Sequence, residues 1–264
     1  MDRKTARNAP DTQKAGAREF VASLEKGLTI IEAFGPDQAR LTLTDVAKRT
    51  GITRAAARRY LHTLAKLGYA DFDGRYFSLS PRILRLGYAY LSSSSLSERL
   101  QPALERVSIL TGESSSAAML DGDDIVYVAR SATQRIMSVS LGVGIRLPAY
   151  CTSLGRALLA HRPPEELEAY LKRVKLEART PKTITRKADL RMALEEVRRR
   201  GCAVIDEELE LGLRSIAVPL VHPSGSVRIA LNVSTQAARV AAADMEARFL
   251  PALREVSESL RHIL

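Results

Sequence analysis

Two helical patterns joined by a glycine constrain this chain more than any other feature of its sequence. Residues 45–50 (DVAKRT) form a short helical segment, and Thr44 directly before it is a residue type that caps helix N-termini. Gly51 ends the segment, because glycine readily adopts the left-handed conformation that closes a helix. Thr53 then caps a longer helix over residues 54–67. This spacing predicts a helix-turn-helix.

The flanking segments extend this pattern to a winged helix-turn-helix domain over residues 20–80. Residues 20–34 place apolar side chains at three- and four-residue steps, which predicts an amphipathic helix that packs on the other two. Two short aromatic-rich runs, 68–72 and 75–79, are joined by a DG dipeptide that is typical of a tight hairpin turn. The hairpin is the predicted wing, and Arg75 just past its tip is placed to contact phosphate or the minor groove.

The positive charge of the chain is concentrated in this region. The 264 residues have a formal net charge of +10. Residues 40–85 hold ten basic and three acidic side chains, a surplus of seven, which leaves three for the other 218 positions. On the second helix an Arg-rich face lies opposite an apolar stripe. The Arg-rich face is either a solvated surface or a DNA-binding surface, and the turn that precedes the helix favours DNA binding. The residues expected to contact double-stranded DNA are Thr44, Thr53, Arg54, Ala55, Arg58, Arg59, His62 and Arg75.

The rest of the chain is expected to form a linker and a second domain. Residues 1–19 are polar and are expected to be a flexible tail. Residues 81–95 form a linker helix that ends in four serines, a predicted hinge. Beyond it, over residues 96–264, hairpin patterns mix with helices, which predicts an α+β domain with one mainly antiparallel sheet. The expected strands are 114–120, 125–129, 135–141, 202–206, 215–221 and 228–234.

Several classes of protein are excluded by what the sequence lacks. No apolar run is long enough to span a membrane, and no apolar signal-peptide core follows the first basic residues. Two cysteines and four scattered histidines provide neither a disulfide framework nor the spacing of a metal site. We therefore expect a cytoplasmic protein with no metal, no cofactor and no membrane contact.

Catalysis has two candidate nucleophiles, Cys151 and Ser153, but no base is spaced beside either of them. We therefore do not expect an enzyme. A small-molecule enzyme that uses one of these two residues remains an alternative, as does a non-specific DNA-binding protein. The acidic run over residues 206–210 is expected to be a solvated loop.

Ligand binding is the remaining possibility for the second domain. Thr152 and Ser153 open a helix, and the free amides at a helix N-terminus favour a carboxylate. Ser215, Asn232 and Ser234 are polar residues inside otherwise apolar strands. They face either a bound polar molecule or solvent, and the pattern alone leaves both readings open.

The sequence resembles one family of bacterial transcription regulators over nearly its whole length from residue 20. FVASLEKGLTIIEAF, TLTDVAKRTGITRAAARRYLHTLAKLGY and the DG hairpin resemble the winged-helix half of the IclR family. CTSLGRALLA, DEELELGLRSIAVPL and IALNVS resemble its effector-binding half. SPRILRLGYAYLSSSSL, ESSSAAMLDGDDIVYVAR and RIMSVSLGVGIRLPAY are similar to the subgroup that controls the protocatechuate, 4-hydroxybenzoate and β-ketoadipate pathways.

This resemblance implies a GAF-like α/β domain that binds a small organic acid, aromatic or dicarboxylic. It also implies dimers through the N-terminal domain, often paired into tetramers, on a palindromic operator, with either repression or activation as the outcome. Residues 20–34 and the linker helix would form the dimer surface. Carried over by position, the pocket comprises Ile136, Val139 and Leu147 as apolar walls, with Ser153, Leu154, Leu213, Ser215, Asn232 and Ser234.

Overall fold

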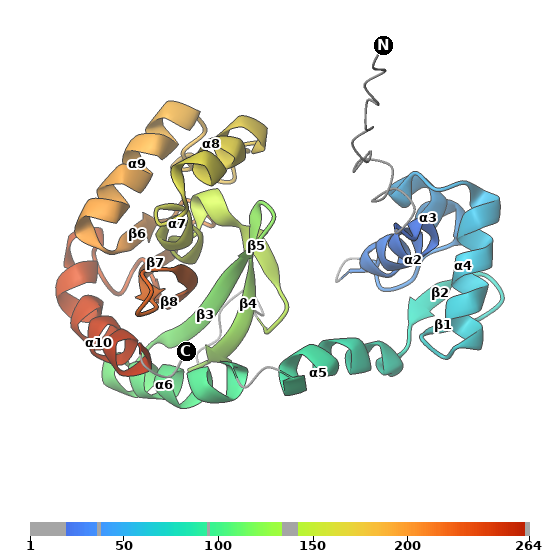
Figure 1. Ribbon diagram of the computed structural model, residues 1–264, viewed down its shortest axis with the longest axis horizontal. Helices are drawn as coiled ribbons and strands as arrows, with labels where there is room; N and C mark the ends of the chain where they lie inside the picture. The colour runs from blue at the N-terminus through green and yellow to red at the C-terminus, as the bar shows by residue number, and fades with distance from the viewer. Residues whose placement is uncertain (1–19, 36–37, 94–95, 134–141, 262–264) are drawn as a thin grey trace, which may run out of the picture. The chain divides into compact units, whose positions relative to one another are not determined.

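The computed structural model describes residues 20–35, 38–93, 96–133 and 142–261 (Figure 1). The chain divides into two compact units, Met1–Tyr90 and Leu91–Leu264, each with its own hydrophobic core. No helix in the described ranges is both long and apolar enough to cross a membrane. The predicted α+β class, with an N-terminal helix-turn-helix followed by an antiparallel sheet domain, is confirmed.

Unit 1 packs helices against a short hairpin. Its elements are α2 (Ala22–Glu32), α3 (Leu43–Thr50), α4 (Arg54–Lys66), β1 (Ala70–Phe72) and β2 (Phe77–Leu79). Strands β1 and β2 pair antiparallel, and a bridge between Leu41 and Phe77 adds a third extended segment to the wing. The core residues of the unit come from each of the three helices, the wing and the bridging segment: Ile30, Ala33, Leu41, Val46, Ala57, Leu61 and Phe77.

The N-terminus of α3 differs from the prediction. Thr42, not Thr44, is the cap: its hydroxyl accepts the amide of Asp45 at 3.2 Å, and the Asp45 carboxylate accepts the Thr42 amide at 2.9 Å. Both hydrogen bonds together form a capping box, which requires an acceptor three residues after the cap. Gly51 ends α3 with φ +67°, and Thr53 caps α4, both as predicted.

The wing leads into a short 3₁₀ helix, η1 (Pro81–Ile83), and then into α5 (Leu84–Ser93). Helix α5 continues into the serine run that the sequence predicts as a hinge, and it crosses the division between the two units. Its first turns expose the large side chains of Leu84, Leu86 and Tyr88.

Unit 2 is built on a six-stranded sheet in the order β5-β4-β3-β8-β7-β6, with every neighbouring pair antiparallel. The strands are β3 (Ser114–Asp121), β4 (Asp124–Ser131), β5 (Arg146–Pro148), β6 (Ala203–Asp206), β7 (Leu213–Val221) and β8 (Val227–Gln236). The strand predicted over residues 135–141 lies outside the described residues. The sequence did not reveal β5, because three residues are too few to show an alternating pattern.

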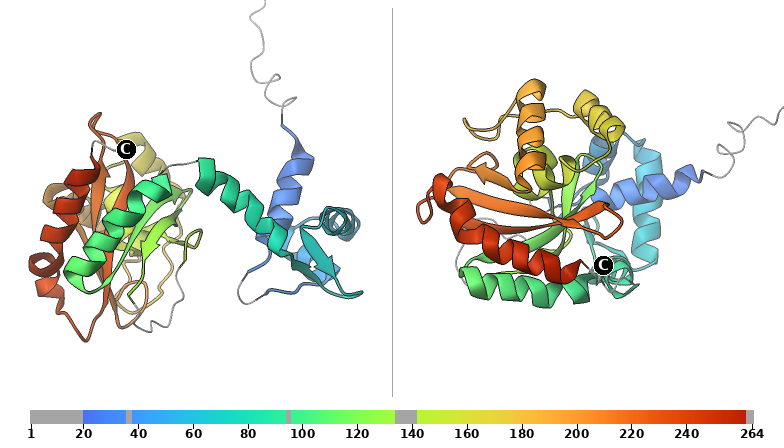
Figure 2. Two further views of the ribbon diagram at one scale, coloured as in Figure 1. Left: turned by 90° about the horizontal axis from the view of Figure 1, so that it is seen from below. Right: turned by 60° about the vertical axis from the view of Figure 1, so that its left-hand side comes forward.

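Helices cover both faces of this sheet, which makes three layers (Figure 2, right). Helices α6 (Leu96–Thr111) and α10 (Met245–Leu260) pack on one face. Helix α7 (Ser153–Leu159) lies on the other face, with α9 (Lys187–Arg200) against it and α8 (Pro164–Arg173) on the same side. The short 3₁₀ helix η2 (Ala149–Cys151) leads into α7.

Helix α7 is the central element of its layer, because all of its residues are buried. Gly155 allows this position: a Cβ atom there would clash with the backbone of Ala149 in η2. The N-terminus of α7 is capped by Thr152, whose hydroxyl accepts the amide of Gly155 at 3.2 Å. The close approach of η2 and α7 therefore fixes the position of residues 151–154 above the sheet.

Candidate functional site

Helix α4 presents an exposed basic face. Arg54, Arg58 and Arg59 are exposed, whereas Ala57 and Leu61 on the opposite side are buried in the core of unit 1. None of the three arginines forms an ion pair with another described residue. Guanidinium groups without an internal partner are available for phosphate or for base edges. Thr44, Thr53 and Ala55, the other predicted contacts of α3 and α4, are exposed too.

His62 is exposed on one side, and its ring also packs against the wing. Its ring makes edge-on contacts with Phe72 and Phe77, each with ring centroids 5.4 Å apart. The two phenylalanines are stacked with centroids 4.3 Å apart. The structure therefore gives His62 a packing role between α4 and the hairpin that the helical pattern does not reveal.

The wing tip is held by Asp73. Its carboxylate accepts the backbone amides of Tyr76 at 2.7 Å and Arg75 at 2.9 Å, and it forms an ion pair with Arg40. These hydrogen bonds, that of Tyr76 foremost, lower the pKa of Asp73. Gly74 turns the chain with φ +99°. The exposed guanidinium of Arg75 lies 5.1 Å from the Tyr76 ring centroid, so the tip carries cations on a defined turn.

Unit 2 contains a small cavity between α7 and the polar side of the sheet. Most of the predicted pocket residues line it, namely Ser153, Leu154, Leu213, Ser215, Asn232 and Ser234, together with Tyr127, Cys151, Thr152, Ile205 and Leu209. Leu147 lies on β5 and packs against the adjoining core rather than lining the cavity. Ile136 and Val139 lie outside the described residues.

The polar strand residues face this cavity and not solvent. Ser215, Asn232 and Ser234 are each less than 9% exposed, and Ser215 lies directly opposite Ser234 in the sheet. The side-chain amide of Asn232 donates to Ser234 Oγ at 3.1 Å. Asn232 Oδ1 and Ser153 Oγ are buried and have no hydrogen-bond partner in the described part of the chain. Buried polar atoms without partners are destabilising, so a bound polar molecule that pairs with them would remove a penalty.

The cavity has a volume of about 20 Å³, which is room for one water molecule. Cavities that hold a benzene-sized molecule are on the order of 150 Å³. A ring-containing ligand would therefore have to displace side chains of the cavity wall when it binds.

Cys151 has the properties of a core residue. Burial raises the pKa of its thiol to about 11, against the opposing effect of Arg179 and Arg156. A protonated thiol is a weak nucleophile. Ser153, the other candidate, has no base hydrogen-bonded to its hydroxyl in the described part of the chain. No group of histidine, cysteine and carboxylate side chains that could hold a metal ion occurs among the described residues.

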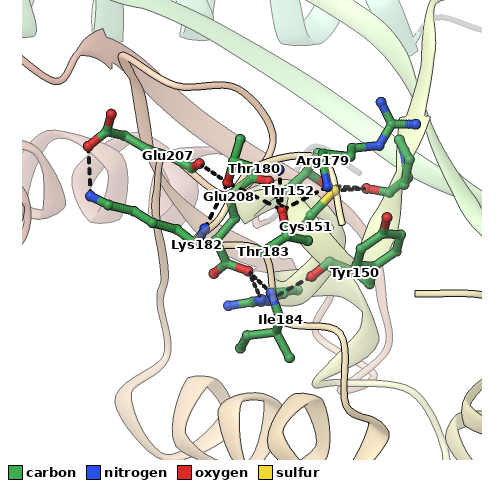
Figure 3. Close-up of polar contacts among 12 residues, drawn as sticks. Tyr150, Cys151, Thr152, Arg179, Thr180, Lys182, Thr183, Ile184, Glu207 and Glu208 are labelled. Carbon is green, nitrogen blue, oxygen red and sulfur yellow. Dashed lines mark hydrogen bonds and ion pairs between the residues drawn. The ribbon is translucent and has the colours of Figure 1, made fainter. Parts of the chain in front are cut away.

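The acidic run after β6 is not a solvated loop throughout, so that prediction was wrong for Glu208. Its carboxylate accepts a hydrogen bond from Arg156 of α7 at 2.5 Å. The carboxylate also accepts the Ile184 amide at 3.1 Å, and the Glu208 carbonyl accepts the Thr183 hydroxyl at 2.6 Å (Figure 3). Both side chains of the ion pair are buried. Arg156 Nε also donates to the Tyr150 carbonyl at 2.8 Å, so the pair ties α7 and η2 to the segment that follows β6.

Comparison with known proteins agrees with this two-unit organisation. Residues 23–74 match the model of the IclR helix-turn-helix domain, and residues 88–262 match that of the bacterial transcriptional regulator IclR C-terminal domain.

Two curated relatives cover nearly the whole chain. The Pca regulon regulatory protein of Pseudomonas putida is 51% identical over 94% of this chain and 86% of its own length. The p-hydroxybenzoate hydroxylase transcriptional activator of Acinetobacter baylyi is 38% identical over 96% of this chain and 95% of its own.

Solved structures of similar proteins share the fold. A putative transcriptional regulator from Rhodococcus sp. RHA1 is 48% identical, with a TM-score of 0.78 over 92% of this chain and 98% of that one. An IclR homologue from Microbacterium hydrocarbonoxydans, in complex with 4-hydroxybenzoate, is 25% identical, with a TM-score of 0.74 over 91% of this chain and 98% of that one.

Proposed function

The chain belongs to the IclR family of bacterial transcriptional regulators, and we propose that it binds its operator through α4 and senses a small organic acid in the cavity of unit 2. Like its curated relatives, which are regulatory proteins, it is a DNA-binding regulator and not an enzyme. The acid-sensing part rests above all on Ser153 Oγ and Asn232 Oδ1, two buried polar atoms that line the cavity without partners among the described residues.

The operator surface we propose is the exposed face of α4 together with the wing tip. Arg58 and its neighbours enter the major groove, while Arg75 contacts the backbone or the minor groove. Thr44, Thr53, Arg54, Ala55 and Arg59 flank the same face, and His62 supports it through the wing.

The protein is proposed to act as a homodimer or tetramer on a palindromic operator in the cytoplasm. Helix α2 and its N-terminal flank expose Val21, Leu24 and Leu28, and α5 exposes Leu84 and Leu86. Apolar surfaces of this kind are typical of subunit interfaces. Residues 81–95 would then connect paired DNA-binding domains to the sensing domains, over residues 96–264.

The effector we propose is an aromatic acid, with a dicarboxylic acid as the second candidate, in the control of aromatic-compound catabolism. The names of the relatives refer to the Pca regulon and to p-hydroxybenzoate hydroxylase, and one similar structure holds 4-hydroxybenzoate. The pocket would comprise the cavity-lining residues Ser153, Leu154, Leu213, Ser215, Asn232 and Ser234, with Leu147 of the adjoining core, Ile136 and Val139 as further walls.

Thermal unfolding in the presence of 4-hydroxybenzoate, protocatechuate and β-ketoadipate tests the sensing function. A ligand present at 100 times its Kd stabilises the folded state by about 2.7 kcal/mol. The same acid should change the affinity for operator DNA, because binding energies at two coupled sites are linked.

A matched pair of variants locates the site. Ser153→Ala should lose most of the acid-induced stabilisation, whereas Ser108→Ala, a serine on the opposite side of the sheet that bonds Ser115 at 2.9 Å, should keep it. If no acid of the panel stabilises the protein or changes operator binding, the acid-sensing function is wrong.

A further inference from the structure

Strand β4 carries an arginine on the same side of the sheet as the cavity. In the register of the sheet, Arg130 lies directly opposite Ser116 of β3, and Ser116 lies directly opposite Asn232 of β8. Residues directly opposite one another project from the same face. Arg130, Ser116 and Asn232 therefore form a polar row across three strands, and Asn232 at one end of the row lines the cavity.

The guanidinium of Arg130 is only partly satisfied. One terminal nitrogen donates to Ser116 Oγ at 3.3 Å, while Nε is buried and has no partner in the described part of the chain. No carboxylate of the described residues forms an ion pair with it. Burial lowers the pKa of Arg130, and Tyr127, which lines the cavity, is the group that acts on it in the opposite direction.

Two other arginines of unit 2 with largely buried side chains each pair with a carboxylate. Arg156 is 5% exposed and paired with Glu208, and Arg214 is 14% exposed and paired with Asp206. An arginine stays charged in proteins, so it cannot escape the cost of burial by losing its proton. Arg130 is half-buried, its Nε is fully buried, and no carboxylate of the described residues pairs with it, which points to an anion from outside the chain.

We infer that Arg130 binds the carboxylate of the effector, at the opposite end of the polar row from Asn232. This inference rests on the proposed acid-sensing function of unit 2. A guanidinium can present two parallel N–H groups to a carboxylate, and the edge that contains Nε is the one without a partner. Asn232 and Ser153 would then pair with polar groups elsewhere on the same molecule.

The alternative places the carboxylate at the first amides of α7, as the sequence pattern suggests, and calorimetry separates the two. The probes are 4-hydroxybenzoate and protocatechuate, each compared with its uncharged carboxamide, on the full chain. Wild type should bind the acids more tightly than the carboxamides. Arg130→Met should weaken acid binding on the order of 10–100-fold, with a change of less than about threefold for the carboxamides. Arg130→Lys should fall in between.

A matched control is Arg146→Met, which removes an arginine from β5 that is paired with Asp121 and Asp124. It should leave the preference for acid over carboxamide at the wild-type value. The thermal unfolding curve of each unliganded variant reports whether it folds. If Arg130→Met does not fold, the wild-type comparison of acid with carboxamide and the Arg130→Lys variant decide the question.

Two results would overturn the inference and leave the sensing function intact: Arg130→Met binds the acids as tightly as wild type, or wild type binds acid and carboxamide equally. A wild-type protein that binds none of the acids would overturn both the inference and the sensing function.

Discussion

Replacing Glu208 should strongly destabilise unit 2. The side chains of Arg156 and Glu208 are 5% and 10% exposed, and their charged groups are 2.5 Å apart. Glu208→Ala leaves the guanidinium buried without its counter-charge, a change that costs about 3–5 kcal/mol. For a unit of 174 residues each kcal/mol shifts the midpoint by roughly 2–4 °C, so unit 2 should unfold roughly 6–20 °C lower.

Thermal unfolding of the full chain, followed by circular dichroism and calorimetry, measures this shift. Glu208→Gln keeps an acceptor for the Ile184 amide, so its unfolding midpoint should fall less than that of Glu208→Ala. Removing both charges with Arg156→Met and Glu208→Leu should recover part of the loss, because no charge is then left unpaired. Glu196→Ala, which breaks an exposed pair with Arg199, should lower the unfolding midpoint far less than Glu208→Ala, because solvent screens exposed charges. If Glu208→Ala and Glu196→Ala unfold at the same temperature, the buried pair of Arg156 and Glu208 does not stabilise unit 2.

Three further predictions follow from individual residues. Arg58→Ala should weaken operator binding and reduce the slope of log affinity against log salt by about one, while Arg199→Ala on α9 should change neither; unchanged operator binding would remove Arg58 from the interface. Gly155→Ala should destabilise unit 2 by about 1–3 kcal/mol in thermal unfolding because its Cβ meets the backbone of Ala149, whereas Gly27→Ala, with open space around it, should not be destabilising. Cys151, with a pKa of about 11 and a buried side chain, should react with iodoacetamide far more slowly at pH 7.5 in the folded protein than in the denatured one, and faster as the pH rises toward 11; rapid labelling of the folded protein, detected by mass spectrometry, would contradict its placement.

The helix-turn-helix was predictable because its signals are local. Gly51 and Thr53 act on their own neighbours in the chain, and their positions in the sequence are enough to place the turn and the second helix. The error at Thr44 is also local: threonines stand at both 42 and 44, and only Asp45, three residues after Thr42, selects Thr42 as the cap.

The cavity was only partly predictable, because it depends on pairing between distant strands. The pattern could not decide whether Ser215 on β7 and Asn232 on β8 face inward, since both strands are buried on both faces over most of their length. Arg130 was missed for a related reason: a bulge in the pairing of β3 and β4 puts it on the same face as Tyr127, three residues earlier, whereas regular alternation would separate them. The partner of Glu208 lies 52 residues away, beyond the reach of any local pattern.

The size of the cavity bears on the sensitivity of the regulator. Under the proposed sensing function, a space of about 20 Å³, which holds one water, would make a binding-competent form with a wider cavity a minor population of the free protein. The apparent affinity for any effector is then the intrinsic affinity reduced by the fraction of molecules in that open form. Substitutions that loosen the packing of α7 would raise this fraction and lower the effector concentration needed for a response, without altering one polar contact to the ligand. The detection threshold of this regulator could therefore be adjusted through its hydrophobic core independently of its chemical specificity.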